Sequence, residues 1–293
     1  MLRFLFAIGL SIVSFLILVS LSAAWVLVST PRPTNIKSCF VTEMYQVHLC
    51  PQDPDYTPIR EIPHGVKMAV VVSEDGSFYD HSGFDWFELR ESLKKDLKAG
   101  HFARGGSTIT QQLAKNLYLT KEKSIFRKIR EAILASQIEE ILTKEEILEK
   151  YFNVVEFGPD IFGIKSAAKF YFSKQVSNLS IAEGAWLAML LPNPIKNHQS
   201  FKKGKLSPFA RREITKIIKR LVSFRKISPE SAEKSILELN TLFSKGVNRD
   251  KDLGGELDSQ EELAKKSSDE NEESEDEATG ESSEDPDDSW FGD

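Results

Sequence analysis

The sequence of 293 residues contains only two cysteines and five histidines, and their spacing does not resemble a zinc site. Glycine and proline number 16 and 12, and 41% of the residues are hydrophobic, which excludes a low-complexity chain. No charged residue occurs between Phe4 and Ser29. The segments at both ends of the chain cannot join a soluble core, the first because it is a long apolar run and the last because it is strongly acidic. Roughly residues 40–248 are therefore left for a globular region.

The uncharged run is long enough to span a bilayer, for which about 20 apolar residues suffice. It exceeds the roughly 7–15 residues of a signal-peptide core, and Trp25 near its end is typical of an interfacial anchor. We therefore expect an uncleaved transmembrane signal anchor over residues 4–29 and, because prolines recur after it, an extended stalk over 30–61. Cleavage near Ala23 is the alternative.

The two cysteines, Cys39 and Cys50, enclose ten residues of the stalk. A disulfide closes this short loop if this side of the membrane is oxidising, and two free thiols are the alternative.

Charge divides the chain into two opposite parts. Residues 250–293 contain 19 acidic residues and three lysines, so their charge of −16 within a total of −6 leaves +10 on residues 1–249. A basic folded region attracts phosphates, pyrophosphates or anionic head groups, and charge alone also permits nucleic acid. The tail has almost no aliphatic residue before Trp290 and Phe291, so we expect it to be disordered. These two aromatics suggest that the tail recruits a partner, and a solubilising tail with two incidental aromatics is the alternative.

Helical patterns dominate the region between these segments. Apolar residues recur at helical spacing, and Ser or Thr precedes several of the runs as a potential cap. The predicted helices cover residues 107–119, 125–142, 144–152, 184–191, 208–224 and 229–239. Only Met68–Ser73 favours a strand, with a buried helix as the alternative, so the fold class is mainly α.

Three segments carry the residues for chemistry, and the first follows the apolar run at Met68–Ser73. Glu74 and Asp75 lie at its end and His81 lies shortly after. A carboxyl group beside an apolar wall has its pKa raised by desolvation, which suits a general base. The alternative is a solvated turn with a histidine used in packing.

The second and third segments are cationic. Ser107, Gln111 and Lys115 are spaced at i, i+4 and i+8, so one helical face offers a hydroxyl, an amide and an ammonium to an anion. Arg127 and Lys128 precede Glu131 by one turn, and such cations neutralise a phosphate. An ordinary solvated face and a plain i, i+4 ion pair are the alternatives.

Together these segments resemble glycosyltransferase family 51, the peptidoglycan glycosyltransferases. The first family motif, E-D-x-x-F-x-x-H-x-G, stands at 74–83, and the second, G-x-S-T-I-T-Q-Q-L-x-K-N, stands at 105–116. The third, R-K-x-x-E, stands at 127–131, and the fourth stands at 144–153. Further similar residues follow from Gly163 to Pro194, and the resemblance spans about residues 62–239.

This resemblance implies a lysozyme-like, two-lobed glycosyltransferase domain over 62–245 that polymerises lipid II, inverts C1 and releases undecaprenyl pyrophosphate. Glu74 would be the general base, and Glu131 a second acid near the pyrophosphate or an associated Mg²⁺ or Mn²⁺. The resemblance implies no organic cofactor. The residues implied in binding substrate are Ser107, Gln112, Lys115, Asn116, Arg127 and Lys128, and the choice between Gln111 and Gln112 stays open. Those that complete the motifs are Asp75, Phe78, His81, Gly83, Thr108 and Asn153.

The resemblance also sets the expected partners and location. They are lipid II, the nascent glycan strand, membrane lipid and other cell-wall synthesis proteins, without nucleic acid. The expected location is the cytoplasmic (inner) membrane, crossed once, with the domain on the extracytoplasmic (periplasmic) side. Chain length favours the type without a transpeptidase domain. A lysozyme-like lytic enzyme and a membrane-anchored scaffold are the competing interpretations.

Overall fold

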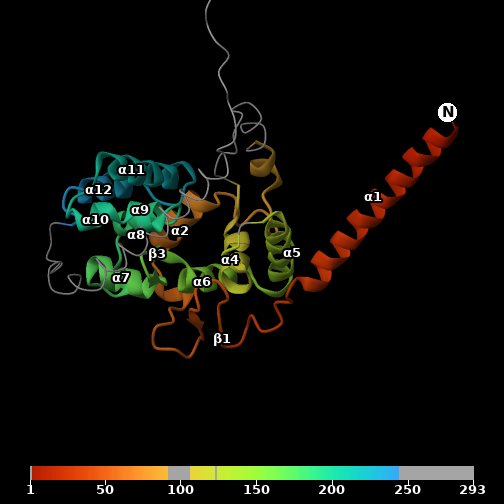
Figure 1. Cartoon of the computed structure of the whole chain (residues 1–293). Helices are drawn as coiled ribbons and strands as arrows, with labels where there is room; N and C mark the ends of the chain where they lie inside the picture. The colour runs from red at the N-terminus through yellow and green to blue at the C-terminus, as the bar shows by residue number, and fades with distance from the viewer. Residues whose placement is uncertain (1, 92–105, 123, 244–293) are drawn as a thin grey trace, which may run out of the picture. The chain divides into compact units, whose positions relative to one another are not determined.

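The computed structural model describes residues 2–91, 106–122 and 124–243, and in these residues it is mainly helical, as predicted (Figure 1). The longer helices are α1 (Leu2–Ser29), α2 (His64–Glu74), α4 (Ile109–Tyr118), α5 (Ile125–Ile141), α6 (Lys144–Val154), α7 (Ile164–Phe172), α8 (Ile181–Leu190), α11 (Pro208–Ser223) and α12 (Pro229–Glu238). Short helices are η1 (Ile59–Glu61), η2 (Val176–Asn178), α9 (Pro194–Asn197) and α10 (Gln199–Lys202). Two antiparallel strand pairs complete the described residues: β1 (Phe40–Val41) with β2 (His48–Leu49), and β3 (Glu156–Gly158) with β4 (Ile161–Phe162).

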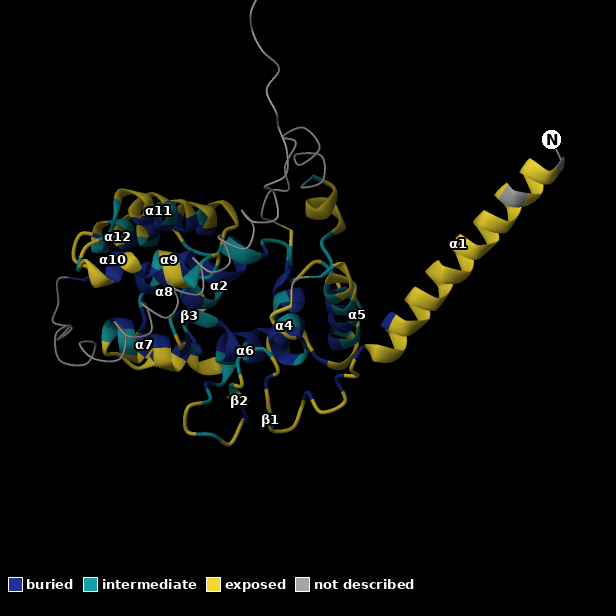
Figure 2. Ribbon diagram, viewed as in Figure 1, coloured by how far each residue is buried: buried dark blue, intermediate teal, exposed yellow. Residues whose placement is uncertain are grey.

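Helix α1 is long and apolar enough to cross a membrane. The span Arg3–Ser29 contains 27 residues, and a window of 18 of them has a mean hydropathy of 2.7. Figure 2 shows the helix exposed along most of its length. Among the described side chains of α1 only Val26 is buried, and its carbonyl accepts a hydrogen bond from the hydroxyl of Thr30 at 2.7 Å. The predicted anchor is therefore a continuous helix in the structure.

Helix α2 is packed from several sides, and the prediction of a strand at Met68–Ser73 is wrong. Val66 and the run Met68–Val72 are all buried, where α2 packs against α8 and α11. A helix enclosed in this way needs no polar face, so its short apolar sequence carries no helical period. The alternative of a buried helix is the correct one.

Close packing of α2 against α8 depends on two glycines. A Cβ atom on Gly184 would lie 2.8 Å from the Cα of Val66, and one on Gly65 would lie 2.6 Å from Ile181 Cγ1. Both distances are shorter than carbon atoms tolerate. At Gly184 the contact is with backbone, so a side chain there would push the helices apart, and at Gly65 the side chain of Ile181 would have to move. The glycines thus fix how near α2, which ends at Glu74, lies to α8.

Three helices begin with a capping box, in which a Ser or Thr and a Glu or Gln three residues later each accept from the other's backbone amide. Thr143 with Glu146 begins α6, and Ser180 with Glu183 begins α8. Thr108 with Gln111 begins α4, so Ser107 lies just before the helix and not on its face. In each case the hydroxyl accepts from one of the amides that a helix start leaves unpaired.

The stretch predicted as an extended stalk, residues 30–61, packs against the helical domain over much of its length. Ile36 and Leu49 are buried, and the amide of Glu43 donates to the carbonyl of Leu117 at 2.9 Å. Cys39 and Cys50 form a disulfide. Residues 30–61 therefore form a folded segment and not an extended stalk, because apolar side chains such as Ile36 and Leu49 are buried.

Candidate functional site

Glu74 is the last residue of α2, and its carboxylate is the end of a chain of hydrogen bonds that includes side chains of two other helices. The amide Nε2 of Gln112, on α4, donates to Glu74 Oε2 at 2.9 Å. The hydroxyl of Tyr151, on α6, donates in turn to Gln112 Oε1 at 2.9 Å. Because Tyr151 occupies the amide oxygen, the amide nitrogen of Gln112 is fixed towards Glu74.

The neighbouring carboxylate, Asp75, joins α2 to the start of α4. Asp75 is buried, and its Oδ2 accepts from the backbone amide of Ile109 at 3.0 Å, at the positive end of that helix. Its Oδ1 lies 2.9 Å from His81 Nε2. The hydroxyl of Thr108 donates to the carbonyl of Gly83 at 2.7 Å. These contacts hold the loop after Glu74 against α4.

Phe78 and Asn153 also hold the framework of the site. Phe78 is fully buried, and the ammonium of Lys144 lies 4.4 Å from the centre of its ring. Asn153 donates to the carbonyl of Thr57 at 2.9 Å and accepts from the amide of Thr57 at 2.8 Å. Asn153 therefore ties the segment before α2 to the end of α6.

The environment of Glu74 favours its protonated form. Burial raises the pKa of Glu74 above its ordinary value of 4.5, and the charge of Asp75 acts in the same direction. The hydrogen bond from Gln112 and the charges of Lys115 and Arg220 oppose this rise in pKa. A carboxyl group tuned in this way can accept a proton closer to neutral pH than an ordinary glutamate can.

A second carboxylate, Glu131, lies in a cluster of cations on α5 and α4. It is 2% exposed, and its Oε2 lies 3.2 Å from Arg127 Nη1, while Lys128 Nζ donates to its Oε1. Lys128 Nζ also donates to the hydroxyl of Ser107 at 2.8 Å. Two cations thus share one buried carboxylate.

The ammonium group of Lys115 interacts with both carboxylates, Glu74 and Glu131. Burial lowers the pKa of Lys115, the charge of Glu131 opposes that change, and Arg127 and Lys128 lower the pKa further. Glu74 also interacts with Lys115. With Arg127 and Lys128, Lys115 gives three cations around one glutamate, so the cluster has positive charge left for an anionic ligand.

The two adjacent glutamines have different contacts in the structure. Gln111 is buried, and its Oε1 accepts from the amide of Thr108 at 3.0 Å to complete the cap of α4. Gln112 contacts Glu74. The predicted face of Ser107, Gln111 and Lys115 is therefore wrong, because α4 begins at Ile109 and Gln111 serves the cap.

The remaining predicted residue, Asn116, is also buried, and its backbone carbonyl accepts from the amide of Met44 at 3.3 Å. Tyr151 and Arg220 belong to the site but are not among the residues predicted from the sequence. Tyr151 stands within the fourth motif, which offers a signal for it, whereas no spacing relates Arg220, on α11, to Glu74. Among the residues that the structure describes, no group of three histidine, cysteine, aspartate or glutamate side chains could hold a metal ion.

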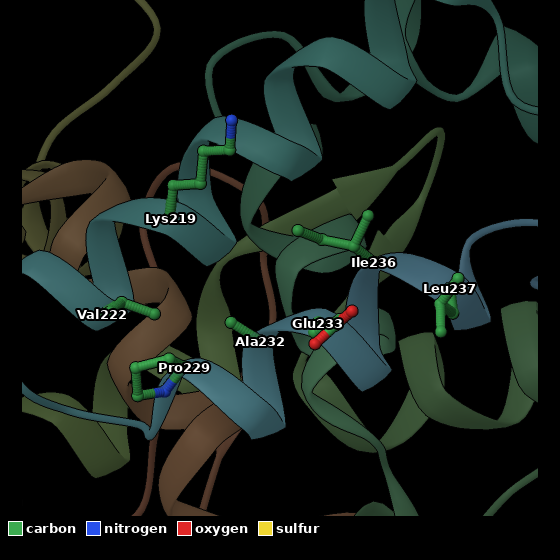
Figure 3. A pocket seen from close by; sticks show the side chains of 7 residues that line it. All are labelled: Lys219, Val222, Pro229, Ala232, Glu233, Ile236 and Leu237. Atoms are coloured by element: carbon green, nitrogen blue, oxygen red, sulfur yellow. The ribbon is translucent and has the colours of Figure 1, made fainter.

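A groove of about 520 Å³ lies elsewhere on the domain, between α11 and α12 (Figure 3). Its lining includes Lys219, Val222, Ala232, Ile236 and Leu237, and none of the predicted site residues. The candidate site is therefore the set of contacts around Glu74 and Glu131 and not this groove.

The sequence profile of the transglycosylase family matches residues 42–221, which is more than half of the chain. The chain belongs to this family. The matched range contains every predicted site residue from Glu74 to Asn153, so the candidate site lies within the transglycosylase domain.

Several relatives are named biosynthetic peptidoglycan transglycosylase. The one from Azoarcus sp. (strain BH72) is 47% identical over 146 residues, which are 50% of this chain and 63% of the relative. The one from Dechloromonas aromatica (strain RCB) is 43% identical over 139 residues, which are 47% and 60%. The one from Acinetobacter baylyi is 38% identical over 196 residues, which are 66% and 86%. The chain thus spans less than two thirds of the first two relatives and most of the third.

The raised pKa of Glu74 predicts how stability depends on pH. The folded state holds the Glu74 proton more tightly than the unfolded state, so the contribution of Glu74 to stability falls as pH rises from about 4.5 through the folded pKa. Thermal unfolding in detergent, followed from about pH 3.5 to 8, should show Glu74→Gln gaining stability relative to wild type across this window.

Glu213→Gln provides the control of opposite sign. A hydrogen bond from Lys216 lowers the pKa of Glu213, so this carboxylate contributes stability that is lost as pH falls through its folded pKa. Glu213→Gln should therefore lose stability relative to wild type as pH rises. A pH-independent difference between Glu74→Gln and wild type would contradict the shifted pKa.

Proposed function

We propose that the protein is a peptidoglycan glycosyltransferase that polymerises lipid II. The observation that carries the proposal is that one site holds two unlike groups. One is a carboxyl group with a raised pKa, and the other is a cluster of cations around the buried Glu131 that has surplus positive charge. Transfer of a sugar from a pyrophosphate carrier needs both a base for the attacking hydroxyl and cations for the leaving group. Membership in the transglycosylase family and the names of the relatives support this assignment.

In the proposed reaction Glu74 accepts the proton from the 4-hydroxyl of the acceptor N-acetylglucosamine. The hydroxyl oxygen bonds to C1 of the donor N-acetylmuramic acid as the bond from C1 to the pyrophosphate oxygen breaks. The electron pair leaves with undecaprenyl pyrophosphate, and attack from the opposite face converts the α-linked donor to a β-linked product. Gln112 orients the Glu74 carboxylate for this step.

The leaving pyrophosphate is assigned to Lys115, Arg127 and Lys128. Their ammonium and guanidinium groups offer charge-assisted hydrogen bonds to phosphate oxygens. Glu131 keeps Arg127 and Lys128 side by side, since two like charges would otherwise repel each other. A divalent cation fits poorly, because both oxygens of Glu131 already contact cations, so no step is assigned to a metal.

We further propose that α1 anchors the protein in the cytoplasmic membrane, with the domain on the extracytoplasmic face. The apolar length of α1 and the Cys39–Cys50 disulfide, which an oxidising compartment preserves, support this topology. The predicted acidic tail, residues 250–293, lies outside the described residues. Recruitment of cell-wall synthesis proteins through Trp290 and Phe291 stays a prediction.

Purified lipid II tests the assignment. The wild-type protein should convert it to glycan polymer, and Glu74→Gln should be slower by about 10²–10⁴-fold, because the amide cannot accept the proton. Glu213→Gln, the matched exchange on α11, should polymerise at the wild-type rate. Cleavage of preformed glycan without polymerisation would instead identify a lytic enzyme, and absence of both activities would favour a scaffold.

Single lysine variants test the cationic cluster. Lys115→Ala and Lys128→Ala should each lower kcat/KM for lipid II by about 10–100-fold, since each removes a charge-assisted contact to the pyrophosphate. Lys216→Ala removes an exposed lysine paired with Glu213 and should leave kcat/KM within about twofold. Equal, small losses at all three positions would mean that the positive charge acts only as a diffuse field.

A further inference from the structure

The end of α1 lies beside α5 (Figure 1). Three interactions among four side chains connect it to the beginning of α5. The rings of Trp25 and Phe126 meet edge to face, with centroids 5.7 Å apart. The guanidinium of Arg130 lies 4.7 Å from the centre of the Trp25 ring, and its Nη2 donates to the hydroxyl of Ser29 at 2.9 Å. Aromatic and cationic contacts thus join the apolar helix to the domain.

The same turns of α5 carry the cations of the candidate site. Phe126 and Arg130 are four residues apart, so they lie on one side of α5 and face Trp25. Arg127 and Glu131 are also four residues apart, and their side of α5 is turned by about 100° around the helix axis from that of Phe126 and Arg130. On this side both residues interact with Lys115. A displacement of this part of α5 away from α1 would therefore move Arg127 and Lys128 as well.

Few buried apolar side chains hold the first two turns of α5. Ile125 is 80% exposed and Ile129 is 44% exposed, so neither anchors the helix in the core. The first buried apolar residue of α5 is Leu134, and Glu131 is the one buried residue before it. Segments with few buried apolar contacts open most readily. These turns therefore depend on polar contacts, which are the Ser124 cap, the ion pairs of Glu131 and the bond from Lys128 to Ser107, and on the contact with α1.

We propose that Trp25 and Arg130 are positioning residues, through which the membrane helix keeps Arg127 and Lys128 in a fixed position relative to Glu74. This inference rests on the proposed function, because it assigns α1 a part in the reaction beyond holding the enzyme at the membrane. The Trp25–Arg130 contact fixes the first turns of α5, and the cations on those turns then meet the pyrophosphate in a constant place. Misplacement of a binding group by about 1 Å can cost on the order of 100-fold in rate.

The test uses the full chain and lipid II together in detergent micelles, so that loss of membrane attachment does not itself lower the rate. Trp25→Ala and Arg130→Ala should each lower kcat/KM by about 10–100-fold. The double variant should be no slower than the slower single variant, because both changes break the same contact between Trp25 and Arg130. Trp25→Phe keeps an aromatic ring for Phe126 and Arg130 and should recover most of the rate.

Arg212→Ala is the matched control, since Arg212 also stacks on an aromatic ring, that of Phe209 at 5.6 Å, but on α11. It should leave kcat/KM unchanged. Hydrogen exchange supplies a readout that does not depend on activity. The backbone amides of residues 127–131 should exchange faster in Trp25→Ala and Arg130→Ala than in wild type, and those of α11 should not change.

Either of two results would overturn the inference: unchanged exchange in residues 127–131, or faster exchange with kcat/KM within twofold of wild type. Multiplicative losses in the double variant would also overturn it, because the two residues would then act separately. A wild-type protein that forms no polymer would instead refute the proposed function. In that case the exchange comparison still decides whether α1 holds the first turns of α5.

Discussion

The buried carboxylate of Asp75 is the junction on which the candidate site depends. It accepts from the first amide of α4 while its other oxygen meets His81, so the end of α2 and the start of α4 are held together. Glu74 precedes this junction by one residue, and Gln112 follows it by one turn of α4. Their hydrogen bond is a consequence of that arrangement. A residue that takes no part in the chemistry thus determines where the proposed base lies.

Charge is divided within the site in a way that suits two different tasks. Around Glu74, burial disfavours the ionised carboxylate, and the hydrogen bond from Gln112 compensates only in part. Around Glu131, two cations surround one carboxylate, and Lys115 adds a third positive charge. One region is therefore suited to gain a proton and the other to bind an anion. Their proximity through Lys115 is the property that a transfer from a pyrophosphate carrier requires.

The features best predicted from the sequence are those that depend on residues close together in the chain. Ser and Thr before the helical runs predict caps, and Thr143 caps α6 in this way. The run Met68–Ser73 instead favours a strand, because a helix packed on several sides lacks the polar face that marks a helix in the sequence. Gln112 could not be chosen over its neighbour until the start of α4 was known, since that start commits Gln111 to the cap. Arg220 could not be found, because only the packing of α11 brings it near Glu74.

The central claim is that Glu74 accepts a proton in an environment that Gln112 controls. The pH dependence of kcat/KM for lipid II tests it most directly in wild type and in Gln112→Leu. The rate should rise with pH as Glu74 ionises, with an apparent pKa above 4.5, and loss of the Gln112 hydrogen bond should move this limb to higher pH. A limb at or below pH 4.5 in wild type, or the same limb in both proteins, would contradict the account.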